Sequence, residues 1–163
     1  MSKIKHVYLD MDGVIADFDG KCVELFGAPF NEATPSESWK RINKVEDFWM
    51  SLPIFDGALV FINELLTFCA VNDCMLHVLS GTPNSNTDRS EIQKMIWLKF
   101  HTPQIHPSKV HFCKSRSKQM YADKFSVLID DRESNIEAWN LHSGHGILHK
   151  SFDLSLQSLK ELL

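Results

Sequence analysis

Two aspartates, Asp10 and Asp12, stand two positions apart directly after a short apolar run, in the segment LDMDGVIADFDG. In an extended chain, residues at i and i+2 point to the same side, so both carboxylates can face one reacting atom. A second pair, Asp130 and Asp131, follows another apolar run. Crowded carboxylates are costly unless a proton or a cation lies among them, and oxygen donors favour Mg²⁺ over zinc. We therefore expect the four aspartates to form a Mg²⁺ site, and which of Asp130 and Asp131 ligates the ion directly stays open.

The chemistry that suits this set of residues is phosphoryl transfer. A carboxylate can attack phosphorus when Mg²⁺ and positive donors neutralise the phosphoryl oxygens, and water then hydrolyses the aspartyl-phosphate. We expect Asp10 to be the nucleophile and Asp12 to act first as general acid and then as general base. Ser80 would bind phosphoryl oxygens, and Lys118 would offset their charge. Asn135 either orients Asp131 or the water shell of the metal, or it contacts the start of the next helix.

The elements that must position these residues alternate between strands and helices. Apolar runs at residues 6–9, 75–79 and 126–129 each end at polar residues, and residues 110–112 and 146–148 are further strand candidates, the last at an edge. A helical pattern places four residues on one face of a first helix: Ala58, Ile62, Leu65 and Cys69. A second amphipathic helix would carry Ile92, Met95, Ile96 and Lys99 on one face, and a closing helix is expected at 154–162. This order predicts an α/β fold, with a parallel sheet, helices on both faces, and a site beyond the carboxyl ends of the strands.

One segment, residues 19–55, interrupts the alternation. It carries three of the six prolines, together with scattered aromatic residues and two short helical stretches. We interpret it as a small helical cap inserted after the first strand. Residues 1–18 and 56–163 would then form one core domain, as the length of 163 residues suggests.

Four elements in this order resemble the haloacid dehalogenase (HAD) phosphohydrolases: DMDGV at 10–14, a strand ending in Ser80, Lys118, and LIDDRESN at 128–135. Four segments further resemble those of the 5'(3')-deoxyribonucleotidases, which remove phosphate from deoxynucleoside monophosphates: DMDGVIADFDG, FWMSLPIFDGA, KMIWL and LIDDR. The resemblance implies a Rossmann-like core, a helical cap between the first and second motifs, Mg²⁺ dependence and an aspartyl-phosphate intermediate.

The resemblance also assigns a substrate pocket. It implies that Phe18 and an aromatic residue from Phe48 or Trp49 enclose the base and sugar, and that Lys94 is a second phosphate contact. The segment 19–55 is shorter than the family's cap, which leaves the preferred base open.

Two assignments in the phosphate site stay open. The second motif reads Ser80-Gly81-Thr82-Pro83, so Thr82 instead of Ser80 could contact phosphate, with Gly81 beside it. The charge-offsetting lysine could be Lys118, Lys114 or Lys94, and we favour Lys118, with Lys94 as the second phosphate contact.

Composition excludes several other classes of protein. A formal net charge of −4 gives no field to attract long duplex nucleic acid or an anionic membrane. The most apolar stretch, 58–71, is interrupted by Asn63 and Glu64 and is too short to span a bilayer. The four cysteines form no CxxC motif, and no signal-peptide pattern opens the chain, so we expect a reduced, cytoplasmic protein. The oligomeric state is open, and a homodimer is compatible with the sequence.

The leading hypothesis is a Mg²⁺-dependent phosphomonoesterase whose partner is a small nucleotide. An alternative is a HAD phosphatase for another small phosphate ester or for a polynucleotide 3'-phosphate, because the core motifs do not specify the leaving group. A non-catalytic phosphoacceptor resembling receiver domains is a different class, as is a binding subunit. Asp12 argues against a phosphoacceptor, because an acid/base two residues from the nucleophile makes an aspartyl-phosphate short-lived.

Overall fold

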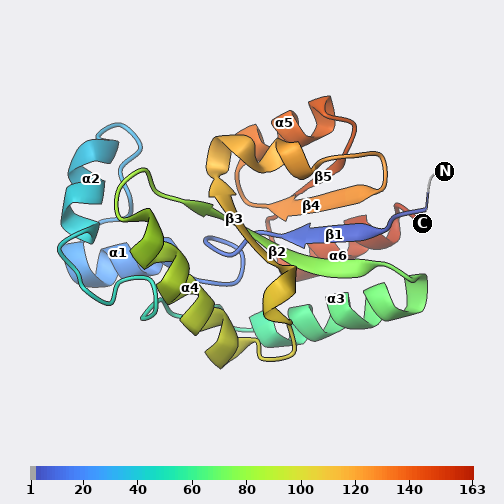
Figure 1. The fold of residues 1–163 in the computed structure, drawn as a ribbon, viewed down its shortest axis with the longest axis horizontal. Coiled ribbons are helices and arrows are strands. Elements are labelled where there is room, and N and C mark those ends of the chain that lie inside the picture. Colours follow the sequence, from blue (N-terminus) through green and yellow to red (C-terminus); the bar gives the residue numbers. More distant parts are fainter. Residues whose placement is uncertain (1–2) are drawn as a thin grey trace.

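Parallel strands form a sheet at the centre of the molecule, in the order β3-β2-β1-β4-β5 (Figure 1). The computed structural model describes residues 3–163. The strands are β1 (His6–Leu9), β2 (Met75–Thr82), β3 (Val110–Lys114), β4 (Ser126–Asp130) and β5 (His145–Leu148). β1 lies between β2 and β4, so the carboxyl ends of these three strands open at the same edge of the sheet. The predicted parallel α/β fold is therefore confirmed.

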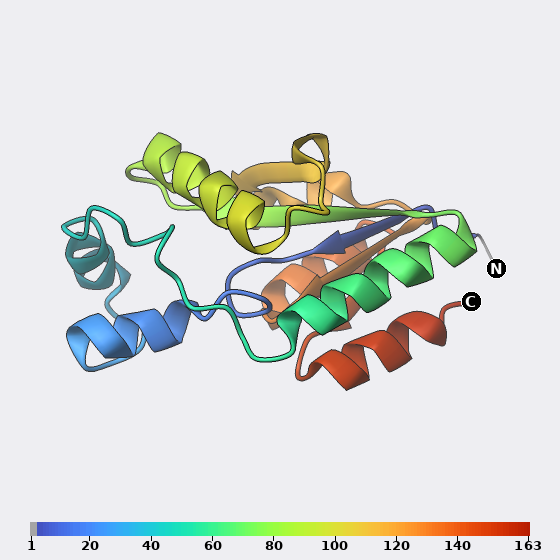
Figure 2. The same cartoon turned by 90° about the horizontal axis from the view of Figure 1, so that it is seen from below.

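Helices cover both faces of the sheet (Figure 2). α3 (Ala58–Asn72) and α6 (Phe152–Lys160) pack side by side, and the apolar core on their face includes Val7, Leu9, Val78 and Val127. On the other face, α5 (Glu133–Leu141) and the 3₁₀ helix η2 (Ser115–Tyr121) cover Tyr8, Leu79 and Leu128. Burial on both faces explains why the strands read as continuous apolar runs. Within residues 3–163, no helix has both the length and the apolar character that a membrane span requires.

Two short helices, α1 (Phe18–Phe26) and α2 (Pro35–Ile42), lie to one side of the sheet, beyond the carboxyl end of β1 (Figure 1). The chain leaves and re-enters the core at neighbouring points, because Ala16 forms an antiparallel bridge with Ile54. The amide of Asp17 donates to the carbonyl of Pro53 at 2.8 Å, beside this bridge. The domain boundaries at 19 and 55 stay a prediction.

β2 and β3 are each longer by at least two residues than the apolar runs suggested. β2 continues through Ser80 and Gly81 to Thr82, and these residues pair with Phe112, Cys113 and Lys114 of β3. Pairing continues because it uses backbone groups, which do not depend on the polarity of the side chain. The phosphate-site candidates of the second motif therefore lie on a strand and not in a loop.

The predicted buried face of α4 (Thr87–His101) is wrong. Ile92 and Ile96 are 62% and 48% exposed, and the buried residues are Ser90, Gln93, Lys94, Trp97 and Leu98. Polar residues occupy this face because they find hydrogen-bond partners inside the protein, as described below. The closing helix, predicted at 154–162, spans Phe152–Lys160. The remaining short helix is η1 (Pro107–Lys109).

Candidate active site

A tight loop follows β1 and sets the positions of Asp10 and Asp12. The amides of Ile15 and Ala16 both donate to the carbonyl of Met11, at 2.9 and 3.0 Å. Gly13 makes this turn with φ +81°, a conformation that L side chains rarely adopt. A Cβ atom at Gly13 would lie 2.1 Å from Oδ2 of Asp131. Glycine is therefore required here both for the turn and for the close approach of the second acidic pair.

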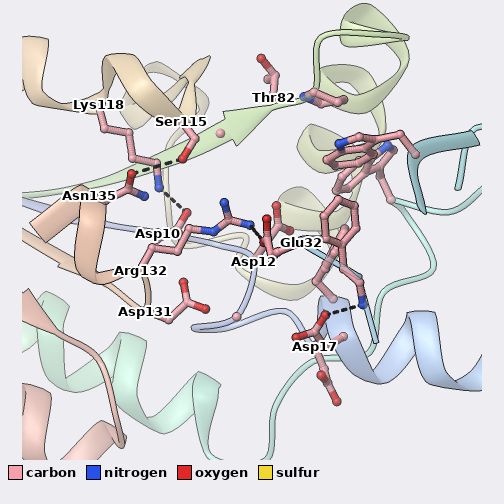
Figure 3. A pocket seen from close by; sticks show the side chains of 18 of the residues that line it. Asp10, Asp12, Asp17, Glu32, Thr82, Ser115, Lys118, Asp131, Arg132 and Asn135 are labelled. Atoms are coloured by element: carbon pink, nitrogen blue, oxygen red, sulfur yellow. Dashed lines mark hydrogen bonds and ion pairs between the residues drawn. The ribbon is translucent and has the colours of Figure 1, made fainter. Parts of the chain in front are cut away.

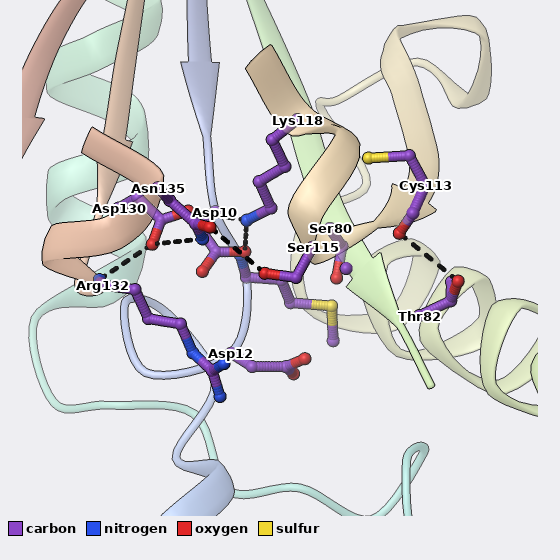
Figure 4. Close-up of polar contacts among 12 residues, drawn as sticks. Asp10, Asp12, Ser80, Thr82, Cys113, Ser115, Lys118, Asp130, Arg132 and Asn135 are labelled. Atoms are coloured by element: carbon purple, nitrogen blue, oxygen red, sulfur yellow. Dashed lines mark hydrogen bonds and ion pairs between the residues drawn. The ribbon is translucent and has the colours of Figure 1, made fainter. Parts of the chain in front are cut away.

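Lys118 joins the two acidic pairs. Its Nζ lies 2.7 Å from Oδ1 of Asp10 and 2.7 Å from Oδ2 of Asp130, with all three residues buried (Figure 4). Asn135 donates from Nδ2 to both carboxylate oxygens of Asp130, at 3.1 and 3.0 Å, and the amide of Arg132 donates to Oδ1. Asn135 therefore orients Asp130, and not Asp131 as predicted, and its side chain makes no capping bond at the start of α5.

Asp10, Asp130 and Asp131 form an acidic cluster, in which three carboxyl groups lie near the single ammonium group of Lys118. Burial, and then the neighbouring Asp130, raises the pKa of Asp10 to about 8, against the opposing effect of Lys118. Desolvation, and then Asp130, raises the pKa of Asp131 to about 6. Although burial opposes the charge on Lys118, Asp10 and Asp130 raise its pKa above the usual value. A bound cation would relieve this repulsion between carboxylates.

Three of the four predicted metal ligands lie together. Asp10, Asp130 and Asp131 each offer one carboxylate oxygen within 4.8 Å of the others, so the group could hold a metal ion. These oxygens match the donors that hard cations prefer. The carboxylate of Asp12 lies outside this group, because it turns towards Lys94.

Lys94 and Ser80 form a separate polar contact with Asp12. Nζ of Lys94 lies 2.6 Å from Oδ2 of Asp12, 3.0 Å from Oγ of Ser80 and 2.7 Å from the carbonyl oxygen of Gly81. Lys94 and Ser80 are fully buried, and neither lines the cavity described below. The structure therefore does not place these two predicted phosphate contacts at the cavity surface. Gly81 and Thr82 do line it.

Lys118 is the lysine that reaches the nucleophile. The alternative, Lys114, turns the other way, donating to the carbonyl of Pro83 at 2.5 Å and to Oγ1 of Thr87 at 3.1 Å. Thr82 donates from Oγ1 to the carbonyl of Cys113 at 3.3 Å.

A cavity of about 430 Å³ extends from the aspartates to the helices α1 and α2 (Figure 3). Its polar end is lined by Asp10, Asp12, Asp131 and Lys118, with Ser115 and Asn135 beside them. Its other wall is aromatic and consists of Phe18, Phe30, Trp39, Trp49 and Phe55. The size matches pockets that enclose small molecules.

Most of the aromatic wall is a set of rings packed against one another. Phe18 stacks on Trp49, with 5.6 Å between ring centroids, and Phe30 lies 4.9 Å from Trp39. Phe48 is fully buried behind the wall and contacts Phe18 and Trp49 by their edges, so the structure does not place it in the cavity. Phe48 and Trp49 were the alternatives for enclosing the base and sugar together with Phe18, and of these two Trp49 is the residue that lines the cavity.

Sequence reasoning missed several residues that line the cavity. The sequence marks Phe30 and Trp39 only as members of an aromatic-rich insertion, and it does not mark Phe55 or Ser115 as site residues. The concentration of aromatic residues in the insertion was a signal for the first two. Ser115 directly follows the strand β3, and this position was a signal that it belongs to the site.

An ion pair lies at the rim of the cavity. Nη2 of Arg132, in the loop after β4, lies 3.2 Å from Oε1 of Glu32, in the loop between α1 and α2. Both residues line the cavity, and both side chains are largely exposed. Exposed pairs of this kind contribute little stability, about 0 to 1 kcal/mol, so the contact can open readily.

Solved structures of HAD proteins share this fold. A HAD family enzyme from Bacteroides thetaiotaomicron, in complex with magnesium and inorganic phosphate, is 15% identical, with 90% of this chain and 94% of that chain covered and a TM-score of 0.54. A hydrolase from Streptococcus pneumoniae TIGR4 is 16% identical over 97% and 99% of the two chains, with a TM-score of 0.52. A HAD hydrolase of family IA from Entamoeba histolytica HM-1:IMSS is 15% identical over 98% and 88%, with a TM-score of 0.51. At these identities the likeness establishes the fold.

The family follows from the sequence. A comparison with curated proteins gives no match. The pattern of the family described as "5' nucleotidase, deoxy (Pyrimidine), cytosolic type C protein" matches residues 3–155, which is nearly the whole chain. The match spans both acidic pairs, the second motif and both buried lysines. The chain therefore belongs to this family of HAD-type phosphohydrolases and is a phosphoric monoester hydrolase.

Proposed function

We propose that the protein hydrolyses deoxyribonucleoside monophosphates in two steps, through an aspartyl-phosphate on Asp10. The observation that carries the proposal is the arrangement of the cavity. A buried carboxylate held by Lys118 at 2.7 Å lies at one end, and a wall of aromatic rings lies at the other. A phosphate ester with a flat apolar group on the far side of a sugar fits such a cavity.

The donor set fits Mg²⁺. Asp10, Asp130 and Asp131 are the residues that would hold the ion. Of the second acidic pair, Asp131 has the freer carboxylate, because Lys118, Asn135 and the amide of Arg132 already engage the oxygens of Asp130. The space above Gly13, which a Cβ atom would fill, lets Asp131 approach the loop after β1. When bound, Mg²⁺ neutralises charge on the phosphoryl oxygens and so lets an anionic nucleophile approach phosphorus.

In the first step, a carboxylate oxygen of Asp10 attacks phosphorus, and the bond from phosphorus to the sugar oxygen breaks. Among the described residues, both hydrogen bonds to the Asp10 carboxylate go to Oδ1, from the amide of Met11 and from Lys118, so Oδ2 is the attacking atom. Asp12 gives a proton to the leaving sugar oxygen. Lys118 offsets the charge that the nucleophile carries.

In the second step, water attacks phosphorus and gives a proton to Asp12. The bond between phosphorus and the Asp10 oxygen breaks, which releases inorganic phosphate and restores the carboxylate. Asp12 thus acts as acid and then as base, and both residues return to their starting states. Thr82 and Ser115 line the cavity, and to contact phosphoryl oxygens their hydroxyls would exchange the bonds that they now donate to the carbonyl of Cys113 and to Oδ1 of Asn135.

The aromatic wall is the support for a nucleotide as substrate. Phe18, Phe30 and Trp39 are partly exposed and offer ring surface on which a base can stack, with the buried Trp49 packed against Phe18, and stacked or tilted aromatic pairs are favourable. The name of the family supports both a deoxynucleotide substrate and a cytosolic location, and we propose both for this chain.

The test is phosphate release with and without Mg²⁺, from deoxy- and ribonucleoside monophosphates, sugar phosphates and a 3'-phosphorylated oligonucleotide. The Asp10→Asn variant serves as the blank. We expect metal-dependent release with a preference for deoxynucleotides. Release confined to the oligonucleotide or to sugar phosphates would overturn the substrate but keep the chemistry. No release from any of them would overturn the proposal.

A further inference from the structure

We propose that Lys94 is a positioning residue, which fixes the carboxylate of Asp12 for proton transfer and does not bind the phosphoryl group. This inference rests on the proposed role of Asp12 as acid and base. It gives a function to a fully buried lysine that the cavity does not expose.

The first observation is that Lys94 has no donor to spare. A lysine ammonium group has three N–H donors. Nζ of Lys94 lies within hydrogen-bond distance of three acceptors: Oδ2 of Asp12, Oγ of Ser80 and the carbonyl oxygen of Gly81. On its remaining side, Nζ lies 4.5 Å from the centroid of the Trp49 ring. A phosphoryl oxygen could reach Lys94 only by displacing one of these groups.

The second observation is that α4, which carries Lys94, is held in place by its neighbours. Nε2 of Gln93 donates to the carbonyl of Glu46 at 2.6 Å, and Nε1 of Trp97 donates to the carbonyl of Leu52 at 2.8 Å. The amide of Trp49 in turn donates to Oε1 of Gln93 at 3.1 Å. These bonds tie α4 to the segment that carries Trp49, so Nζ of Lys94 is fixed relative to both the core and the aromatic wall.

The third observation concerns the two oxygens of Asp12. Lys94 holds Oδ2, whereas Oδ1 is buried and accepts no hydrogen bond from the residues that the structure describes. Buried polar atoms are normally paired, so an unpaired oxygen beside the nucleophile is suited to a partner that arrives with the substrate. Oδ1 would carry the proton to the leaving oxygen and later receive one from water. Fixing Oδ2 keeps the carboxylate from rotating away from this direction.

The same contacts explain the burial of Ser80. Its hydroxyl lies against Lys94 and so contributes to the position of the ammonium group. Ser80 would then act through Lys94 and Asp12, while Gly81 and Thr82 meet the substrate.

The test compares the dependence on leaving group in wild type and in Lys94→Met, which keeps the length of the side chain but removes its charge. Phenyl phosphate needs a proton on its leaving oxygen more than p-nitrophenyl phosphate does, and kcat/KM reports the first step alone. We expect kcat/KM to fall by about 100-fold for phenyl phosphate and by less than about threefold for p-nitrophenyl phosphate. Equal losses on both esters would overturn the inference. Lys99→Met, on the exposed side of the same helix, is the matched control.

A direct binding measurement keeps the test independent of the substrate. We expect the affinity for inorganic phosphate, measured by calorimetry with Mg²⁺ present, to change less than twofold in Lys94→Met. A loss of tenfold or more would identify Lys94 as a phosphate ligand and overturn the inference. If the wild type releases phosphate neither from these esters nor from any nucleoside monophosphate, sugar phosphate or 3'-phosphorylated oligonucleotide, the proposed function has failed, and phosphate binding still decides the role of Lys94.

A double-mutant cycle guards against a general structural effect. Lys94→Met alone leaves the Asp12 carboxylate without its partner, whereas Asp12→Asn with Lys94→Met leaves a neutral pair. If Lys94 acts through Asp12, adding Lys94→Met to Asp12→Asn will reduce kcat/KM for phenyl phosphate by less than about threefold. A further 100-fold loss in the double variant would show that Lys94 acts on its own, and would overturn the inference.

Discussion

The polar end of the cavity is assembled at the carboxyl ends of β1, β3 and β4 and in the helices that follow β3 and β4, whereas the aromatic end is assembled from short helices and loops. Asp10 and Asp130 are held by a buried lysine and by backbone amides, within a sheet whose register fixes their separation. Phe18, Phe30 and Trp39 are held by contacts with one another and with Trp49. The first arrangement is fixed by backbone pairing, and the second by the packing of side chains.

This difference separates chemistry from recognition. Substitutions at the polar end should change the rate with every substrate, because each phosphate ester passes through the same groups. Substitutions at the aromatic end should change the preference among substrates, because they alter only the contacts with the leaving group. The predictions below test this separation, beginning with the largest effect.

Asp10→Asn should abolish turnover with all phosphate esters, by at least about 10⁴-fold, because an amide is a poor nucleophile. The fold should be retained, since the wild-type carboxyl already favours its neutral form, with its pKa raised to about 8 by burial and by Asp130. Phosphate release and thermal unfolding measure the two effects. Turnover within tenfold of wild type would contradict the covalent mechanism.

Asp12→Asn should slow both steps by about 10²- to 10⁴-fold, which is the usual contribution of a general acid and base. Its affinity for Mg²⁺ should stay close to that of wild type, because the Asp12 carboxylate lies outside the acidic cluster. Turnover and a calorimetric Mg²⁺ titration check the two parts. Complete loss of metal affinity would show that the side chain of Asp12 is itself a ligand.

Gly13→Ala should weaken Mg²⁺ binding and lower stability together. The new Cβ atom would displace Asp131, and the residue would keep a left-handed conformation that costs about 1–3 kcal/mol. Gly27→Ala is a matched control, because its φ is also positive but nothing lies within 4 Å of the added atom. If both variants bind Mg²⁺ equally well, Gly13 is needed only for the turn.

Phe18→Ala and Trp49→Ala should raise KM for deoxynucleotides by about tenfold, consistent with loss of about 1–3 kcal/mol of base stacking, with little change for a small aliphatic phosphate ester. Phe26→Ala, also on α1 but away from this cavity, is the matched control. Steady-state kinetics on both substrates decides the matter. Equal increases in KM for the nucleotide and the small ester would overturn the proposal that the base stacks on these rings. They would also overturn the separation between the groups that do the chemistry and those that recognise the substrate.

The metal-free protein should lose stability, by a few degrees in Tm, as pH rises from 6.5 to 8.5. Burial and Asp130 raise the folded pKa of Asp10 to about 8, so the unfolded chain has already released a proton that the folded protein must still give up. The lowered pKa of His77, about 4 through burial and His111, adds a slope of the opposite sign near pH 6.5, where the unfolded side chain still binds a proton, and this slope has faded by about pH 7.5. Thermal scans of wild type and Asp10→Asn measure the effect, and an equal slope in both would contradict its assignment to Asp10.

The sheet and the acidic residues were predictable because their signals are local. Apolar runs ending in Asp10 and Asp130 mark buried strands, and parallel strands bring such residues to one edge. The buried face of α4 was not predictable in this way. Its pattern favoured Ile92 and Ile96, but Gln93 and Lys94 are buried because their partners, Glu46 and Asp12, come from distant parts of the chain.

The aromatic wall was only partly predictable for a related reason. Composition marked the insertion as aromatic, but whether a ring lines a cavity or lies behind it depends on packing. Phe48 and Trp49 are adjacent in sequence, yet only Trp49 lines the cavity. Adjacent residues of the same class carry the same sequence signal, so their separate roles emerge only in three dimensions.

The bonds from α4 to residues 43–52 have a consequence for how this enzyme can diversify. Arg89, Gln93 and Trp97 each donate to a main-chain carbonyl, those of Asn43, Glu46 and Leu52. Every residue type supplies that carbonyl, so the attachment survives when the side chains of the segment are exchanged. The lineage can therefore acquire new leaving-group preferences by substitution in the insertion, without rebuilding the anchor that keeps it over the nucleophile.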